Sequence, residues 1–292
     1  MIDARTIAET RRAVADARRS GQTIGFVPTM GALHEGHGRL IGECRSACDF
    51  VVVSIFVNPT QFGPNEDFTR YPRTPEEDRR RCLDAGASLI FAPSVETMYP
   101  TGAVATTIDV PGLVERLEGA SRPGHFRGVA TVVMKLFQIV QPDMAHFGEK
   151  DYQQLAVIRR MAADLNLPLT IRGVPTHREA DGLAMSSRNR YLNTDERQAA
   201  TVLPRALRNA CEAVQRGERS GDRVRQILRE TVESEQLAHL DYVDVVADGT
   251  VEPVTFLEPG RPAVALIAAR IGPARLIDNA PLPTIAEANG CS

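Results

Sequence analysis

The feature that most constrains the fold is an alternation of short apolar runs with helical patterns between residues 1 and 175. The clearest run, Phe50 to Val57, is almost continuously β-branched or aromatic, as expected of a parallel strand covered on both faces. Shorter apolar runs cover residues 24–27, 88–91, 144–147 and 169–174. Helical patterns are predicted over residues 4–19, 74–86, 129–140 and 152–165, an extended segment over 105–110, and a polar loop over 119–128. This order predicts βαβ units, and therefore an α/β fold with a Rossmann-like, doubly wound parallel sheet.

The pattern changes after about residue 176. A long helix is predicted from Thr194 to about residue 216, through Pro204, and a second helix follows at about residues 221–236. The strand-like pieces after them have no helices between them, and they cover residues 242–246, 264–271 and 276–278. We therefore predict two domains, a Rossmann-like domain over residues 1–175 and a smaller C-terminal α+β domain over residues 176–292.

The charge balance argues against a nucleic-acid surface, because 34 Lys and Arg residues are matched by 37 Asp and Glu residues, a formal net charge of −3. Residues 1–19 lack the apolar core of a signal peptide, and no apolar stretch reaches membrane-spanning length. The five cysteines are scattered and odd in number, which indicates reduced thiols that are core residues or bystanders. We expect a cytoplasmic protein with neither a nucleic-acid nor a membrane partner.

Residues 24–41 predict a strand, a tight loop and the start of a helix. The apolar run ends at Pro28 and Gly31, and helical spacing resumes after His34 and His37. A helix N-terminus presents backbone N–H groups and the positive end of the helix dipole, so it favours anions such as phosphates. The two imidazoles are therefore expected beside a phosphate-binding helix start.

Four polar or Gly-rich loops follow predicted strands, where ligands bind in an open parallel sheet. They are Pro28 to His37, Asn58 to Asn65, Gly148 to Asp151 and Pro175 to Arg190. Lys150 and Arg188 supply cations, Gln61 and Gln154 supply neutral amides, and Ser186 and Ser187 supply hydroxyls. These side chains together favour phosphate chemistry.

Two of these loops resemble the signatures of the nucleotidylyltransferase and class I aminoacyl-tRNA synthetase superfamily. His34-Glu35-Gly36-His37 is similar to its His-x-Gly-His signature, and Met185-Ser186-Ser187-Arg188 is similar to its Lys-Met-Ser-Lys-Ser signature. The resemblance implies a HUP-type nucleotidylyltransferase fold in which both histidines bind ATP phosphates and stabilise charge as diphosphate leaves.

Five motifs in order resemble the pantothenate synthetase (pantoate–β-alanine ligase) family. They begin at Pro28, Asn58, Arg122, Phe147 and Asp181 and read PTMGALHEGH, NPTQF, RPGHF, FGEKDYQQ and DGLAMSSRN. The resemblance implies a cytoplasmic homodimer that uses ATP and Mg²⁺ to condense (R)-pantoate with β-alanine through a pantoyl adenylate. AMP and diphosphate would be released, in the pathway to coenzyme A.

The same resemblance implies the site residues. His37, as proton donor, His34 and Lys150 would be catalytic, while Gln61, Gln154 and Arg122 would bind pantoate or β-alanine. The first domain would bind ATP and pantoate, and the second would act as a lid. The implied ATP-binding residues are Met30, Gly31, Ala32, Leu33, His34, Glu35, Gly36, His37, Gly148, Glu149, Lys150, Asp151, His177, Met185, Ser186, Ser187 and Arg188.

The chain departs from the family pattern at two places. Gly38-Arg39 stands where a leucine commonly follows the second histidine, and His177 stands where a small apolar residue usually lies beside the adenine. The acids at residues 76–78 fall where the family has acids near Mg²⁺, but no metal ligand is assigned.

Other interpretations remain open from the residues. His34 and His37 with Cys44 and Cys48 could form a zinc site, provided that all four side chains converge. A nucleotidylyltransferase that transfers AMP or CMP to a phosphorylated acceptor would need a basic acceptor pocket, whereas Gln61 and Gln154 favour a neutral polyol acid. A nucleotide-sensing scaffold would lack the second-substrate residues, and a tRNA synthetase fragment is disfavoured by the acidic charge.

Overall fold

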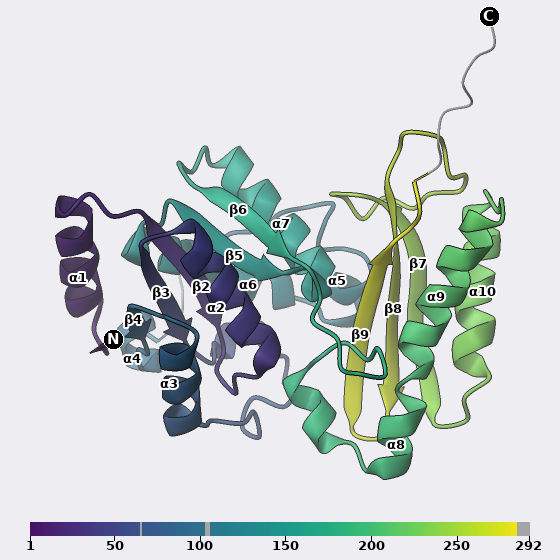
Figure 1. The fold of residues 1–292 in the computed structure, drawn as a ribbon, viewed down its shortest axis with the longest axis horizontal. Helices are drawn as coiled ribbons and strands as arrows, with labels where there is room; N and C mark the ends of the chain where they lie inside the picture. Colours follow the sequence, from purple (N-terminus) through teal and green to yellow (C-terminus); the bar gives the residue numbers. More distant parts are fainter. Residues whose placement is uncertain (65, 103–105, 285–292) are drawn as a thin grey trace, which may run out of the picture. The chain divides into compact units, whose positions relative to one another are not determined.

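The computed structural model describes residues 1–64, 66–102 and 106–284 (Figure 1). The chain divides into two compact units. The first contains the described residues of 1–149 together with 153–177, and the second contains 150–152 together with the described residues from 178 onward. Asn65, the end of one predicted loop, and residue 105 of the predicted extended segment lie outside the described residues.

The first unit is built on a six-stranded sheet in which every pairing is parallel. Its strands are β1 (Ile2–Ala4), β2 (Ile24–Thr29), β3 (Phe50–Ile55), β4 (Leu89–Phe91), β5 (Met144–Gly148) and β6 (Thr170–Val174). The strand order is β1-β4-β3-β2-β5-β6, so the direction of winding reverses between β2 and β5. The predicted parallel sheet is confirmed, and its switch point places the carboxyl ends of β2 and β5 next to each other.

Helices cover both faces of this sheet. Phe26 and Val52 belong to the core cluster that includes residues of α1 and α6, whereas Val27 and Val53 belong to the cluster with α2 and α3. The helices are α1 (Ile7–Arg19), α2 (Glu35–Ala47), α3 (Pro75–Asp84), α4 (Val95–Met98), α5 (Glu118–Ser121), α6 (His125–Val140) and α7 (Tyr152–Asp164), with short 3₁₀ turns η1 (Pro59–Gln61) and η2 (Glu149–Asp151). Because successive residues of β2 and β3 face opposite helical layers, these strands read as continuous apolar runs.

Three details of the first unit differ from the prediction. Residues 2–4 form β1 instead of the start of a helix, because Thr6 caps α1 and accepts a hydrogen bond from the Glu9 N–H. The predicted polar loop at 119–128 contains α5 and the first turn of α6. The described part of the predicted extended segment, residues 106–110, belongs to no strand.

The second unit packs two long helices on a three-stranded antiparallel sheet, as predicted (Figure 1). Its strands are β7 (Ala238–Ala247), β8 (Ala263–Ile271) and β9 (Ala274–Pro281), and its helices are α8 (Thr194–Ala199), α9 (Val202–Gln215) and α10 (Gly221–Glu233), with the turn η3 (Ser187–Tyr191). The prediction of a single long helix from Thr194 is wrong, because α8 ends at Ala199 and α9 begins at Val202. Pro204 lies in the first turn of α9, where its missing N–H costs no helical hydrogen bond.

Among the described residues, no helix is both long enough and apolar enough to cross a membrane.

Candidate active site

The loop between β2 and α2 turns sharply through two left-handed residues. Gly31 has φ +81° and Ala32 has φ +50°. The Asp78 carboxylate on α3 holds this turn, because Oδ2 accepts the Ala32 N–H at 3.0 Å and Oδ1 accepts the Leu33 N–H at 2.7 Å. Gly31, Ala32 and Leu33 are buried. His34 is half-buried, and Glu35 is exposed.

His34 is the N-cap residue of α2, and His37 lies in its first turn. The His34 backbone N–H donates to His37 Nδ1 at 3.3 Å, and the two ring centroids are 4.1 Å apart. Because Nδ1 of His37 accepts a hydrogen bond, the neutral ring carries its proton on Nε2, which can therefore donate to an anion. The predicted pair of imidazoles at a helix N-terminus is confirmed as a geometric arrangement.

Gly36 and His177 lie against the same helix start. A Cβ on Gly36 would be 3.0 Å from Cε1 and Nδ1 of His34 and 3.6 Å from the His177 Cβ. His177 Nε2 is 3.6 Å from a carboxylate oxygen of Glu35. His177 therefore lies beside the helix start that contains His34.

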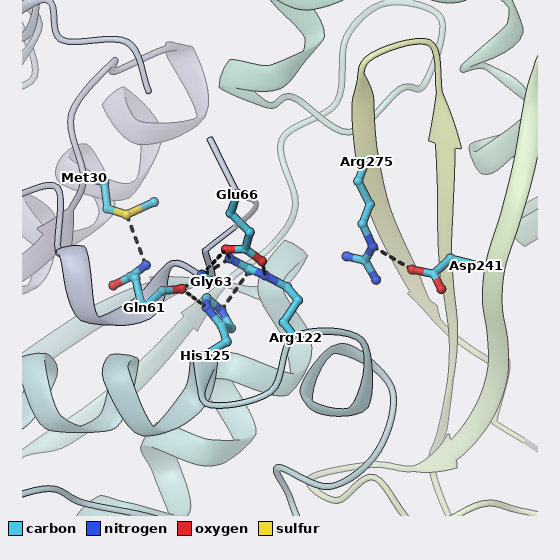
Figure 2. Close-up of polar contacts among 8 residues, drawn as sticks. All are labelled: Met30, Gln61, Gly63, Glu66, Arg122, His125, Asp241 and Arg275. Carbon is cyan, nitrogen blue, oxygen red and sulfur yellow. Dashed lines mark hydrogen bonds and ion pairs between the residues drawn. The ribbon is translucent and has the colours of Figure 1, made fainter. Parts of the chain in front are cut away.

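The Gln61 side chain, in η1 after β3, contacts the sulfur of Met30, the residue that follows β2 (Figure 2). Its Nε2 lies 3.1 Å from Met30 Sδ, and its Oε1 accepts the Asn58 Nδ2–H at 3.1 Å. Asn58 is buried, and its Oδ1 accepts the Tyr99 hydroxyl at 2.7 Å. The sequence did not identify Asn58 as the residue that orients Gln61, although its place at a strand end before Pro59 is a typical turn signal.

Arg122 binds a carboxylate and an imidazole of the same unit (Figure 2). Its Nε and one terminal nitrogen donate to the two carboxylate oxygens of Glu66 at 2.6 and 2.7 Å. The other terminal nitrogen lies 3.0 Å from His125 Nε2, and His125 Nδ1 lies 2.8 Å from the Gln61 carbonyl oxygen. Because a guanidinium only donates, His125 Nε2 accepts and Nδ1–H donates to Gln61.

The charges around Arg122 shift two pKa values. Burial by itself raises the pKa of Glu66, but the hydrogen bonds and the charge of Arg122 outweigh it and hold the pKa below its usual value. Burial, and next the charge of Arg122, lower the pKa of His125 to about 4. At neutral pH His125 is thus the neutral link between Arg122 and the Gln61 backbone.

Two adjacent glutamines of α7 have different surroundings. Gln153 is buried, and its amide bonds the Leu113 carbonyl at 2.6 Å, the Arg116 carbonyl at 2.9 Å and the Glu118 N–H at 3.0 Å. Gln154 is half-buried, and within the described part of the chain its amide has no hydrogen bond. Gln154 is therefore the one of the pair that can bind a ligand without giving up an internal contact.

Lys150 is grouped with the second unit, although Gly148 and Glu149 belong to the first. Asn279 Nδ2 donates to the Lys150 carbonyl at 2.9 Å, and Lys150 Nζ is 3.6 Å from the Asp151 carboxylate. The Tyr152 hydroxyl donates to Asp248 at 3.0 Å. The predicted loop from Gly148 to Asp151 therefore crosses from one unit to the other.

Met185, Ser186, Ser187 and Arg188 lie in the second unit, in the segment that precedes and begins η3. Ser186 Oγ accepts the Arg188 N–H at 3.3 Å. Shortly before the segment, the Gly182 carbonyl accepts a hydrogen bond at 3.0 Å from Arg178, which also forms two hydrogen bonds with Asp278 at 2.7 and 3.0 Å. A second ion pair of this unit, Arg275 with Asp241 at 2.7 Å, is also drawn in Figure 2.

The described residues contain no group of three or more His, Cys, Asp or Glu side chains arranged to hold a metal ion. Cys44 and Cys48 instead pack against β2, where a Cβ on Gly25 would be 2.4 Å from Cys44 Sγ. Burial, and next the neighbouring Cys48, raise the pKa of the Cys44 thiol, as expected of a core residue. The prediction that these cysteines are core residues is confirmed.

Comparisons with known proteins agree along the chain. The family model described as Pantoate-beta-alanine ligase matches residues 3–281. The pantothenate synthetase of Pelotomaculum thermopropionicum is 54% identical over 280 residues, which cover 96% of this chain and 98% of that relative. The solved pantothenate synthetase of Thermus thermophilus matches with a TM-score of 0.89 and 48% identity over 96% of this chain and 99% of that one. The pantoate–β-alanine ligase of Francisella tularensis, solved in complex with β-γ ATP and β-alanine, matches with a TM-score of 0.78 and 35% identity over 96% of this chain and 97% of that one.

Proposed function

Because this chain belongs to the pantoate–β-alanine ligase family, we propose that it condenses (R)-pantoate with β-alanine and consumes ATP. AMP and diphosphate are the other products. The observation that carries this proposal is the family match over residues 3–281, which includes every loop that follows β2, β3, β5 and β6. The helix start with His34 and His37 fits a reaction in which negative charge develops on a leaving phosphate group.

The reaction proceeds in two steps. An oxygen of the pantoate carboxylate attacks the α-phosphorus of ATP, the bond to the β-phosphate oxygen breaks, and diphosphate leaves. The β-alanine amine then attacks the carbonyl carbon of the pantoyl adenylate, the amide forms, and AMP leaves with the bridging oxygen. The protein mainly positions the reactants and stabilises charge, as in other phosphoryl-group reactions.

We assign ATP to the surface of the β2–α2 loop. The Nε2–H of His37 would donate to a phosphate oxygen as diphosphate leaves, with His34 beside it, and the first N–H groups of α2 would add to the same field. Gly31, Ala32 and Leu33 are buried, so their role is to shape this loop. His177 would meet the nucleotide beside Glu35.

Gln61 and Gln154 would bind pantoate. A neutral amide can hold the hydroxyls of pantoate without neutralising the carboxylate that acts as the nucleophile. Arg122 would act on this region through its neighbours, because most of its N–H groups are already donated to Glu66, His125 and the Gln61 carbonyl. Its direct contact with β-alanine stays a prediction.

The second unit would close over ATP as a lid and contribute Lys150, Asp151 and residues 185–188. Lys150 can be tested selectively, because the chain contains two lysines, and the other, Lys135, stands over the Tyr99 ring at 5.3 Å. Periodate-oxidised ATP forms an imine with a lysine amine, which borohydride then fixes. Labelling of Lys150 should be suppressed by added ATP while labelling of Lys135 is unchanged, and unprotected Lys150 would contradict its role.

Closure itself has a separate test. Small-angle X-ray scattering should show a smaller radius of gyration with ATP and pantoate bound than without them. An unchanged radius would contradict the lid.

Mg²⁺ would enter as its complex with ATP. Mg²⁺ commonly keeps several water ligands and binds substrate phosphates instead of a protein cage, which fits a described chain without a cluster of metal ligands. The ion would neutralise charge on the triphosphate. Removing Mg²⁺ with excess EDTA should abolish AMP formation, and full activity in EDTA would contradict this assignment.

The homodimer and the cytoplasmic location stay proposals drawn from the resemblance. Sedimentation velocity at micromolar concentration should give twice the mass of 31.9 kDa, and fractionation of the source cells should recover the protein with cytoplasmic markers. A monomeric mass, or recovery with the membrane fraction, would contradict the corresponding proposal.

The reaction is tested by supplying ATP with pantoate, with β-alanine, with both or with neither. We expect AMP, diphosphate and pantothenate to form in equal amounts when both acids are present. Diphosphate release at the same rate with and without the two acids would contradict the ligase. Transfer of AMP to a phosphorylated acceptor would support a nucleotidylyltransferase instead.

A further inference from the structure

The Asp78 carboxylate is buried at the base of the loop that leads into α2. Only 1% of Asp78 is exposed. Besides the N–H groups of Ala32 and Leu33, at 3.0 and 2.7 Å, the Thr74 hydroxyl donates to Asp78 Oδ1 at 3.1 Å. Both carboxylate oxygens are therefore engaged within the first unit.

These contacts oppose the strain of the turn. Ala32 adopts φ +50°, which an L-residue with a Cβ rarely does, and it persists only where surrounding contacts hold it. Consecutive backbone N–H groups beside a left-handed residue form a concavity that binds an anion, and here the anion is Asp78. A Cβ on Gly31 would lie 3.0 Å from Asp78 Oδ2, so the carboxylate and the glycine fit each other closely.

The two acids beside Asp78 have different surroundings. Glu77 accepts two hydrogen bonds from Arg81 at 3.0 and 3.2 Å, one helical turn further along α3. Glu76 is exposed. Asp78 is the buried acid of the three, and its carboxylate accepts the Ala32 and Leu33 N–H groups of the β2–α2 loop.

We propose that Asp78 is a positioning residue that sets the orientation of His34 and His37 toward ATP. It acts through the backbone: with the Ala32 and Leu33 N–H groups held, the chain enters α2 with His34 at the N-cap and His37 one turn on. The same contacts reserve those two N–H groups for Asp78, and the His34 N–H donates to His37 Nδ1, so the phosphates would meet the N–H groups that follow His34. The inference rests on the proposed function only for the identity of the ligand.

Asp78→Asn is the direct test, with Asp84→Asn as its matched control. Asparagine keeps the shape of the side chain but presents an NH₂ group to one of the two loop N–H groups, so one hydrogen bond is lost. Asp84 is an exposed acid on the same helix, and its replacement removes the same charge. We expect Asp78→Asn to lower kcat by at least about tenfold in folded protein, whereas Asp84→Asn leaves kcat unchanged.

The second readout is the ¹⁵N–¹H spectrum of the imidazoles, which is independent of the reaction. The His34 and His37 signals, assigned with His34→Gln and His37→Gln, should shift in Asp78→Asn and stay in place in Asp84→Asn. A destabilised Asp78→Asn protein with unchanged kcat and unchanged imidazole signals would overturn the proposal. If the wild-type protein makes no pantothenate, the proposed function fails, and the imidazole signals alone decide the positioning role.

Thr74→Val keeps the proposal testable if Asp78→Asn does not fold. The valine removes the hydroxyl that donates to Asp78 Oδ1 and leaves both loop N–H contacts in place. We expect a fall in kcat of about two- to fivefold and smaller shifts of the same two imidazole signals, both restored in Thr74→Ser. Equal kcat and equal signals in Thr74→Val and Thr74→Ser would overturn the proposal.

Discussion

The imidazole rings of His34 and His37 lie with their centroids 4.1 Å apart at the first turn of α2. The backbone N–H of the first residue donates to Nδ1 of the second, which directs the Nε2 proton of His37 away from the backbone. This relationship distinguishes the two residues: His34 occupies the N-cap position of α2, and His37 carries the Nε2 donor.

His37→Gln should lower kcat by about 10²- to 10³-fold, the usual cost of removing one donor to a developing oxyanion. Glutamine at this position can still bond the N-cap N–H, so the helix start should persist. Steady-state kinetics and thermal unfolding check this, with His239→Gln, at an exposed position of β7, as the control. A His37→Gln enzyme with wild-type kcat would contradict the assigned role.

Gln154→Ala should weaken pantoate binding, whereas Gln153→Ala should lower the stability of the fold. Gln154 has no internal hydrogen bond within the described residues, so its loss should raise KM for pantoate and leave the melting temperature nearly unchanged. Gln153 makes three hydrogen bonds, and its loss leaves buried groups unpaired. The free energy of unfolding should therefore fall by roughly 1–3 kcal/mol. Unchanged KM and kcat in Gln154→Ala would remove it from the pantoate site.

Gly38→Ala should stabilise the protein by about 0.5–1 kcal/mol, because a Cβ there meets no atom within 4 Å and alanine favours the helix. Gly36→Ala is the matched case, since its Cβ would press on the His34 ring at 3.0 Å. We expect Gly36→Ala to lower kcat, and Gly38→Ala to leave it unchanged. Chemical denaturation and initial rates separate the two, and equal behaviour of both variants would contradict this geometry.

Acid should destabilise the first unit through His125. In the unfolded chain this imidazole takes up a proton below its usual pKa near 6.5, whereas in the folded protein it does so only below about 4. Between those pH values the unfolded state binds more protons, so the free energy of unfolding falls as the pH falls, by at most about 1.4 kcal/mol per pH unit.

The variant His125→Asn cannot titrate, yet its amide can still donate to the Gln61 carbonyl. Urea unfolding at several pH values between 7 and 4 should therefore show a shallower loss of stability than in the wild type. The other histidines contribute equally to both proteins. Identical pH profiles would contradict the account of the His125 environment.

Local patterns were enough to predict most of the sheet and the helix start at His34. The strand β2, its loop and α2 follow one another within one segment, and parallel pairing follows from the alternation of strands and helices. The three-residue strand β1 was missed, because its only signal is its pairing with β4, almost ninety residues further on.

The contacts of the site that the sequence did not predict depend on distant partners. The segment around Arg122 reads as a polar loop, but its charge is matched by Glu66, 56 residues earlier. Asp78 is one of three acids in the first turn of α3 to which the sequence assigned no contact, and its partners Ala32 and Leu33 are 46 and 45 residues away. Propensity and periodicity describe neighbours in the chain, so they do not report such contacts.

The central claim is that the pantoate carboxylate attacks the α-phosphorus of ATP, and oxygen isotope transfer tests it most directly. Pantoate with both carboxylate oxygens labelled with ¹⁸O should give AMP that carries one ¹⁸O on its phosphate, while the other stays in the pantothenate amide. Mass spectrometry of AMP and diphosphate reads this result. Unlabelled AMP, or ¹⁸O in the diphosphate, would contradict the adenylate route.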